Sequence, residues 1–196
     1  MKKAIKRLGS ALGLMLMASA GTAQAEIVDF SVGDNSFRLA VYGPLSRVID
    51  DTKGQYDVGV VLRPETSDDL LVVHTGVLLT GDAGIRDLDV AAGLGLRAVY
   101  IGRDDDSGGA VALGGQVETR FPGYERLGFS VYGYFAPEVT SFGQVEKYHE
   151  LGVGLDYQVL KDASLYLGYR EIKTDIAEFS GIRADDSVHI GVRLSF

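Results

Sequence analysis

Residues 187–196 read SVHIGVRLSF, and apolar and polar side chains alternate through the stretch without a break. One face of an extended strand would carry Val188, Ile190, Val192, Leu194 and Phe196. Successive side chains of a strand point to opposite faces of its sheet, so this strand separates an apolar environment from a polar one. The remaining sequence indicates which environment lies on which side.

The first 25 residues have the features of a secretory signal peptide. Lys and Arg residues at 2, 3, 6 and 7 precede an apolar stretch over residues 8–20, and Ala23 and Ala25 form a small-residue cleavage pattern. We expect cleavage after Ala25, which leaves residues 26–196 as a single domain. A retained membrane anchor is the alternative, but the apolar stretch is short for a transmembrane helix.

Charge and cysteine content exclude several classes of function. The predicted signal peptide holds four of the 19 basic residues and no acidic residue, so the mature chain has 15 basic and 27 acidic residues, a net charge of −12. Such a chain does not suit nucleic-acid binding, which requires a basic surface. Without cysteine the chain has neither disulfides, nor thiolate metal sites, nor a lipid-modified amino-terminal cysteine.

The two-residue alternation recurs along almost the whole mature chain, between breaks rich in Gly, Pro and Asp. No segment has the pattern of a long amphipathic helix or of a linker. The pattern predicts ten strands, over residues 27–33, 36–42, 55–63, 69–79, 87–101, 109–121, 126–136, 147–159, 163–173 and 186–196.

Three features favour a membrane barrel over a sandwich or a soluble barrel. Several strands reach about ten residues, enough to cross a bilayer when tilted. The polar face mixes charges with glycines, as a polar lumen does. Aromatic residues near predicted strand ends suit two interfacial girdles: Tyr42, Tyr56, Tyr100, Phe121, Phe135, Tyr148, Tyr157 and Phe196. The predicted fold is therefore all-β, an antiparallel up-and-down transmembrane β-barrel of about ten strands.

The connections test the strand number. Bacterial barrels have an even number of strands, with short turns on the periplasmic side. Placing Phe196 on that side makes the segments 103–109, 136–147 and 174–186 extracellular. The long connection GPLSRVIDDTKG, residues 43–54, then lies on the periplasmic side, against this rule. An eight-stranded barrel with a reorganised amino-terminal segment therefore stays as the alternative.

The terminal stretch SVHIGVRLSF resembles the last strand of bacterial outer-membrane barrels, in which a final Phe is recognised by the assembly machinery. Residues 127–143, LGFSVYGYFAPEVTSFG, and the glycine-rich strands on either side resemble the YfaZ family of small Gram-negative outer-membrane proteins. The most specific element is YGYFAPEVTSFG. The resemblance implies a location and an architecture, with Phe196 as an assembly signal, and it implies no catalytic motif.

Charges of both signs fall on the polar face of the predicted strands. Those expected to face the lumen are Arg38, Asp57, Asp89, Arg97, Glu118, Arg120, Asp156, Arg170 and Arg193. A pore selective for one ion sign would present a ring of one charge. A mixed lumen at a small strand number predicts ion pairs that fill and rigidify a narrow interior, and a wide solute channel is not expected.

Aspartates gather at predicted outer connections, at 68–69, 104–106 and 185–186. Solvated turns are their ordinary explanation. A more specific hypothesis is that Asp104, Asp105 and Asp106 share divalent cations with lipopolysaccharide phosphates, because Ca²⁺ and Mg²⁺ prefer hard oxygen ligands. This hypothesis does not assign a resident metal site.

We expect no enzymatic activity and no cofactor. The histidines, His74, His149 and His189, lie on different strands without a metal-binding spacing, and His189 should face the lumen. The expected role is structural or interactive, or a narrow low-conductance passage, with outer-membrane lipid, lipopolysaccharide and the barrel-assembly machinery as partners. The alternatives are a soluble periplasmic lipocalin-like binding barrel and an outer-membrane lipid-modifying hydrolase, whose serine could be Ser130 or Ser164. The sequence does not indicate an oligomeric state.

Overall fold

The structure is a computed structural model, and it describes residues 26–64, 70–85, 89–103, 106–176 and 179–196. The predicted signal peptide and Asp104–Asp105 lie outside the described residues. No helix in the described ranges is long and apolar enough to cross a membrane.

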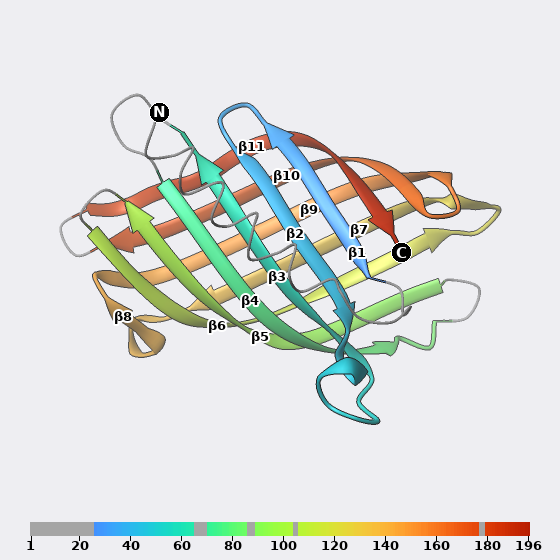
Figure 1. Cartoon of the computed structure of the whole chain (residues 1–196), viewed down its shortest axis with the longest axis horizontal. Helices are drawn as coiled ribbons and strands as arrows, with labels where there is room; N and C mark the ends of the chain where they lie inside the picture. The colour runs from blue at the N-terminus through green and yellow to red at the C-terminus, as the bar shows by residue number, and fades with distance from the viewer. Residues whose placement is uncertain (1–25, 65–69, 86–88, 104–105, 177–178) are drawn as a thin grey trace.

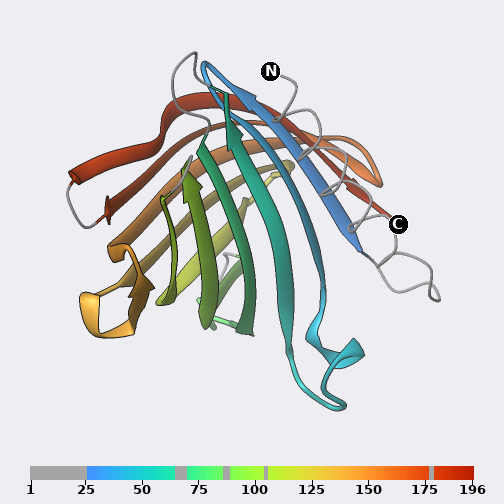
Figure 2. The same cartoon turned by 60° about the vertical axis from the view of Figure 1, so that its left-hand side comes forward.

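One antiparallel sheet curves round and closes on itself (Figures 1 and 2). Ten strands form the closed wall, because β5 pairs with β6 and β1 pairs with β11. The strands are β1 (Ile27–Gly33), β2 (Phe37–Pro44), β3 (Gly54–Arg63), β4 (Leu70–Asp82), β5 (Asp89–Arg103), β6 (Asp106–Phe121), β7 (Tyr124–Ala136), β9 (Val145–Leu160), β10 (Ala163–Ile176) and β11 (Phe179–Ser195). The prediction of about ten strands is confirmed, and the eight-stranded alternative is wrong.

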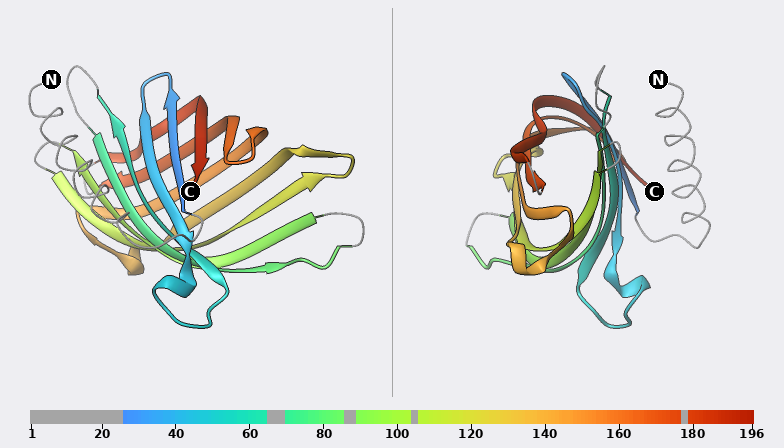
Figure 3. Two further views of the ribbon diagram at one scale, coloured as in Figure 1. Left: turned by 45° about the vertical axis from the view of Figure 1, so that its right-hand side comes forward. Right: turned by 90° about the vertical axis from the view of Figure 1, so that its left-hand side faces the viewer.

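Three short elements lie outside this wall. The 3-10 helix η1 (Leu45–Arg47) is part of the long connection from β2 to β3, at the end of the barrel that carries Phe196. The 3-10 helix η2 (Glu138–Thr140) and the three-residue strand β8 (Ser141–Gly143) lie between β7 and β9, where β8 pairs with β6. The strand register places η1 and β8 at opposite ends of the barrel, whose closed wall Figure 3 shows from two further sides. We call these ends the Phe196 end and the loop end.

The first and last strands close the barrel. Seven residue pairs join β1 to β11, from Ile27 with Ser195 to Gly33 with His189. Beyond them, the backbones of Glu26 and Phe196 exchange two hydrogen bonds of 2.9 and 3.2 Å. Every strand of the wall therefore has a partner on both sides, and the edges that would otherwise expose backbone N–H and C=O groups are removed.

The apolar face of the alternating strands points outward. Leu94 and Leu96 of β5, Leu113 of β6 and Ile190 of β11 all have at least half of their surface exposed. Their polar neighbours Arg97 and His189 are buried in the interior. The soluble lipocalin-like alternative, which needs apolar faces turned inward, does not fit this arrangement.

Two expectations for individual residues are wrong. Tyr42 and Tyr148 were expected in outer girdles, but Tyr148 is fully buried and Tyr42 bonds to Arg38 inside the barrel. Both occupy inward positions of their strands, where a hydroxyl finds polar partners that lipid does not offer. Tyr100, Phe135 and Tyr157 are exposed on the outer face, as girdle residues would be.

The outward apolar band makes a prediction about stability. Leu96 lies near the middle of β5, so Leu96→Arg should place a charge at the centre of the hydrocarbon layer and lower the free energy of unfolding by about 2–4 kcal/mol. Val139→Arg is the matched control, because Val139 in η2 is 90 % exposed beyond the strands of the wall. It should cost less than about 1 kcal/mol. Urea unfolding in lipid vesicles, followed by circular dichroism, measures both variants, and equal costs would contradict the membrane placement of the band.

Candidate functional site

The lumen has three layers along the barrel axis. An apolar cluster fills the loop end, a charged layer follows it, and an open vestibule lies at the Phe196 end. The strand register produces these layers, because it aligns inward positions of neighbouring strands at the same height along the barrel axis. Ser195, Lys161 and Gln158 lie at the Phe196 end, and Val61, Ile101 and Val145 lie at the loop end.

The apolar cluster was not foreseen from the sequence. Its buried members are Val61, Leu70, Val72, Val99, Ile101, Ala110, Ala112, Tyr134, Ala136, Val145, Tyr148, Ile172 and Ala184. Eight strands contribute to it, and each member is at most 6 % exposed. Apolar side chains buried to this extent do not hold water well, so the cluster obstructs a hydrated path through the loop end.

Arg97 organises the charged layer from the loop side. Its guanidinium lies 2.9 Å from Asp57 and 2.7 Å from Glu150, and it stacks 3.8 Å from the centre of the Tyr134 ring. Glu150 also accepts a 2.6 Å hydrogen bond from the Tyr148 hydroxyl. Asp57 and Glu150 come from strands far apart in the wall, so Arg97 ties two sides of the barrel together across the lumen. His74, 3.2 Å from Asp57, lies beside this group.

Asp29 organises a second group closer to the Phe196 end. Its carboxylate lies 3.3 Å from Arg38 and 2.9 Å from Arg193, and it accepts a 2.7 Å hydrogen bond from the Tyr166 hydroxyl. Arg38 donates a further 2.5 Å hydrogen bond to the Tyr42 hydroxyl. Asp29, fully buried on the short strand β1, was missed by the sequence analysis, because IVDFSVG alternates too briefly to establish its facing.

Arg170 and Asp185 form a third group, and this corrects the prediction for Asp185. Asp185 was expected at an outer connection, but it lies within β11, buried, 2.5 Å from Nε of Arg170. Ser36 and Ser187 donate hydrogen bonds of 3.0 and 2.7 Å to it. The strand continues through this polar stretch because the barrel interior supplies partners for its inward residues. Asp186, the next residue, is exposed and pairs with Arg183.

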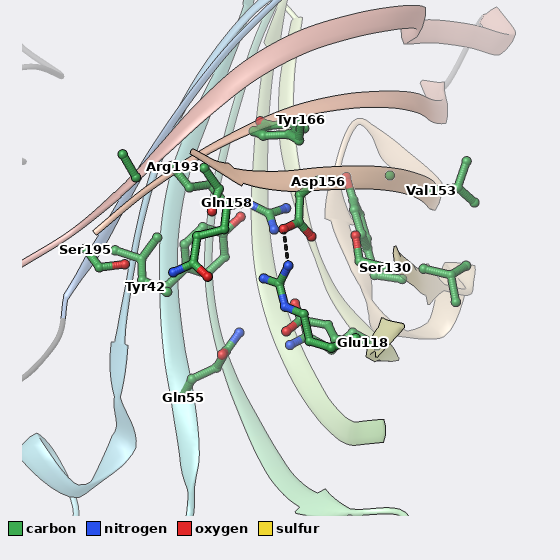
Figure 4. Close-up of a pocket in the computed structure, with 18 of the residues that line it drawn as sticks. Tyr42, Gln55, Glu118, Ser130, Val153, Asp156, Gln158, Tyr166, Arg193 and Ser195 are labelled. Atoms are coloured by element: carbon green, nitrogen blue, oxygen red, sulfur yellow. Dashed lines mark hydrogen bonds and ion pairs between the residues drawn. The ribbon is translucent and has the colours of Figure 1, made fainter. Parts of the chain in front are cut away.

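The vestibule is a cavity of about 220 Å³ at the Phe196 end (Figure 4). The charged residues of its lining are Arg38 of β2, Glu118 and Arg120 of β6, Asp156 of β9, Arg193 of β11, and Lys161 in the turn after β9. Asp156 lies 2.5 Å from Arg120. Three glutamines, Gln55, Gln116 and Gln158, and the hydroxyls of Ser130, Ser164 and Tyr42 add polar atoms.

Glycines on neighbouring strands make room for the rings of two tyrosines that border this cavity. A Cβ on Gly152 would lie 2.3 Å from the ring of Tyr132, and one on Gly191 would lie 2.3 Å from the ring of Tyr166. Each ring therefore lies flat across the missing side chain of the neighbouring strand. This packing brings the Tyr166 hydroxyl to Asp29 and keeps the cavity open.

The charges expected in the lumen occupy different environments. Arg38, Asp57, Arg97, Asp156 and Arg170 are buried, and Arg120 and Arg193 are partly buried beside the vestibule. Glu118 is exposed to the vestibule. Asp89 pairs in register with Arg120 and so shares its face, but it is exposed at the start of β5.

The predicted cation contacts are only partly described. Asp104 and Asp105 lie outside the described residues. Asp106 accepts a 2.8 Å hydrogen bond from the side-chain amide of Gln144, which joins β6 to the β8 segment. Within the described ranges, no three His, Asp or Glu side chains gather as they would around a metal ion. The divalent-cation hypothesis therefore stays a prediction.

The hydrolase alternative needs a serine beside one of the three histidines. His149 is exposed on β9 next to the buried Glu150, so it faces outward, whereas the two candidate serines face inward. Ser130, Ser164 and His189 all line the vestibule rather than the lipid-facing surface. Among the described residues, neither serine hydrogen-bonds to His189, whose ring packs edge-on against Tyr166 at 5.7 Å. A lipid-modifying site would require a serine and a histidine that meet a lipid, which this arrangement does not provide.

A family model described as "YfaZ precursor" matches residues 4–196. A comparison with curated proteins finds no match.

Among solved structures, the chain is similar to three outer-membrane proteins at low identity. The anion-selective porin from Comamonas acidovorans is 13 % identical with a TM-score of 0.38, over 87 % of this chain and 59 % of that one. Outer membrane phospholipase A from Escherichia coli is 12 % identical with a TM-score of 0.42, over 88 % of this chain and 96 % of that one. The KdgM porin is 12 % identical with a TM-score of 0.40, over 88 % of this chain and 99 % of that one. This chain thus spans less than two thirds of the length of the Comamonas porin.

The ion pairs of the charged layer make a second prediction. Arg97→Met should leave Asp57 and Glu150 buried without their cation and lower the free energy of unfolding by about 3–5 kcal/mol. Arg126→Met, at an exposed position of β7, removes the same charge and should cost less than about 1 kcal/mol. Urea unfolding of the two variants in the same lipid provides the comparison. A cost for Arg97→Met as small as that of the control would show that the pairs do not hold the barrel together.

Proposed function

The chain belongs to the YfaZ family and is an outer-membrane β-barrel, and we propose that it has a structural or interaction role in that membrane rather than the role of an open pore. The proposed partners are membrane lipid and lipopolysaccharide along the outward apolar band. A third is the barrel-assembly machinery during biogenesis, with the exposed Phe196 as its signal.

The observation that carries this proposal is the filled lumen. Arg97 links Asp57 on β3 to Glu150 on β9 across the interior, and the apolar cluster occupies the space between this layer and the loop end. Porins that conduct solutes use 16–18 strands to leave a water-filled channel, whereas small barrels are filled by side chains. Ten strands with an interior packed in this way support a barrel that stabilises or organises its surroundings.

A narrow passage is the second candidate. The vestibule favours it, because a cavity of about 220 Å³ already extends into the lumen from the Phe196 end. Ions would then have to cross the charged layer and the apolar cluster through transient rearrangements. Such a passage would show low conductance, because hydrophobic constrictions resist hydration.

Conductance in planar bilayers separates these two candidates. We expect purified wild-type protein to give no channel steps, because the apolar cluster closes the loop end. The triple variant Val72→Ala, Val99→Ala and Ile101→Ala, which cuts this cluster back, should raise the conductance above the wild-type level. Leu94→Ala, Leu96→Ala and Val111→Ala form the control, since they remove comparable volume from the outer face.

Each preparation is first checked for the folded barrel by its faster migration on SDS gels without boiling. Regular channel steps from folded wild-type protein would overturn the structural proposal and establish the narrow passage. Silence from both wild type and the cut-back variant would leave the charged layer as a sufficient barrier by itself.

A further inference from the structure

The vestibule carries charges of opposite sign on opposite walls. Three neighbouring strands carry Arg38 (β2), Asp29 (β1) and Arg193 (β11), and we call these three residues the basic wall. Glu118 and Arg120 of β6 and Asp156 of β9 form the acidic wall, which lies across the closed barrel from β1. We propose that the vestibule binds a small zwitterionic solute, an amino acid or a dipeptide, with its carboxylate at the basic wall and its ammonium group at the acidic wall.

Ion pairs with Asp29 hold the two arginines of the basic wall in place, and both arginines keep N–H groups that can donate to a ligand. Arg193 bonds to Asp29 through Nε and lies 4.7 Å from the centre of the Tyr166 ring, which leaves its terminal nitrogens for an acceptor. Arg38 is 95 % buried, and its Nε has no hydrogen-bond partner among the described residues. A buried donor without an acceptor is costly, and a carboxylate is the acceptor that matches a guanidinium best. Two cations around one carboxylate give this wall a net charge of +1.

The acidic wall has the opposite balance. Arg120 lies 2.5 Å from Asp156 and neutralises it. Glu118 is exposed to the vestibule and makes no ion pair with another described residue. The three side chains of this wall sum to a charge of −1, and Lys161 at the mouth of the vestibule is a further cation outside the wall. The carboxylate of Glu118 is therefore the charged group of this wall that can reach a ligand. A carboxylate in this position suits an ammonium group, which carries three donors and no acceptor.

The size and the remaining lining suit a small polar solute. A cavity of about 220 Å³ holds about seven water molecules at their volume in the liquid, so an amino acid or a dipeptide fits within it. The amides of Gln55 and Gln116 and the hydroxyls of Ser130 and Ser164 can bond to a peptide group between the two charged ends. A purely apolar or singly charged ligand would leave one wall without a partner.

Among the described residues, the site opens towards the Phe196 end of the barrel. Ser195, Lys161 and Ala163 surround the mouth of the vestibule, while the charged layer and the apolar cluster lie beyond it. A solute can therefore bind in the vestibule without crossing the barrel. The binding test is independent of the conductance test of the proposed function.

Binding to three related probes tests the proposal. Alanyl-alanine is the zwitterion, its N-acetylated form keeps only the carboxylate, and its C-terminal amide keeps only the ammonium group. Isothermal titration of the folded protein in detergent should show the zwitterion binding about five- to tenfold more tightly than either blocked form, since each ion pair contributes on the order of 1 kcal/mol. Absence of binding, or equal affinity for all three probes, would overturn the proposal.

Two variants assign the walls. Glu118→Gln should remove the preference for the free ammonium group, so that alanyl-alanine and its N-acetylated form bind equally. Arg193→Gln should weaken both of these probes and leave the amide unchanged. Glu125→Gln is the matched control, because it makes the same charge change on β7 at a position that does not line the cavity. A preference for the ammonium group that survives Glu118→Gln, in protein that still shows the heat-dependent gel shift, would also overturn the assignment.

Discussion

The structure depends on the closure of one hydrogen-bonded sheet. In a lipid environment each unpaired backbone N–H or C=O group costs several kcal/mol, so a sheet can cross the membrane only when it has no free edge. The pairing of β1 with β11, which ends at Glu26 and Phe196, removes the last edge. The short strand β1 is therefore as necessary to the fold as the strands of 15 or more residues on the far side.

Closure at ten strands determines what the interior can hold. The lumen is too narrow to stay fully hydrated, so charges that point inward must find partners within the protein. Arg97 meets this requirement with Asp57 and Glu150, and Arg170 meets it with Asp185. The glycines of neighbouring strands make room for the tyrosines that complete these groups, as Gly152 does for Tyr132. At the Phe196 end the inward side chains leave a cavity, and there the charges remain divided between two walls.

Several features could not be predicted from the sequence, each for an identifiable physical reason. The stretch LLVVHTGVLL is apolar on both faces, so its facing was undetermined. In the structure, Leu70, Val72 and His74 point inward and Val77 and Leu79 outward, because the register with β3 and β5 allows no other choice. Val72 thereby joins an apolar cluster inside a lumen expected to be polar. Polar residues before Ser187 suggested a loop, yet β11 begins at Phe179, because Arg170 satisfies Asp185 within the barrel.

The sequence by itself determined the class of fold and the face that meets the membrane, while the choice between eight and ten strands waited for the closure of β1 on β11. Both properties follow from local periodicity, since each strand segment shows the two-residue alternation in its own sequence, independently of its neighbours. The tertiary structure alone decided which inward charges pair, that one end of the lumen is apolar, and that the vestibule has two walls of opposite charge. Those properties depend on which strands face one another across the closed barrel, and residues such as Asp29 and Arg193, or Arg97 and Glu150, meet only when closure brings distant segments together.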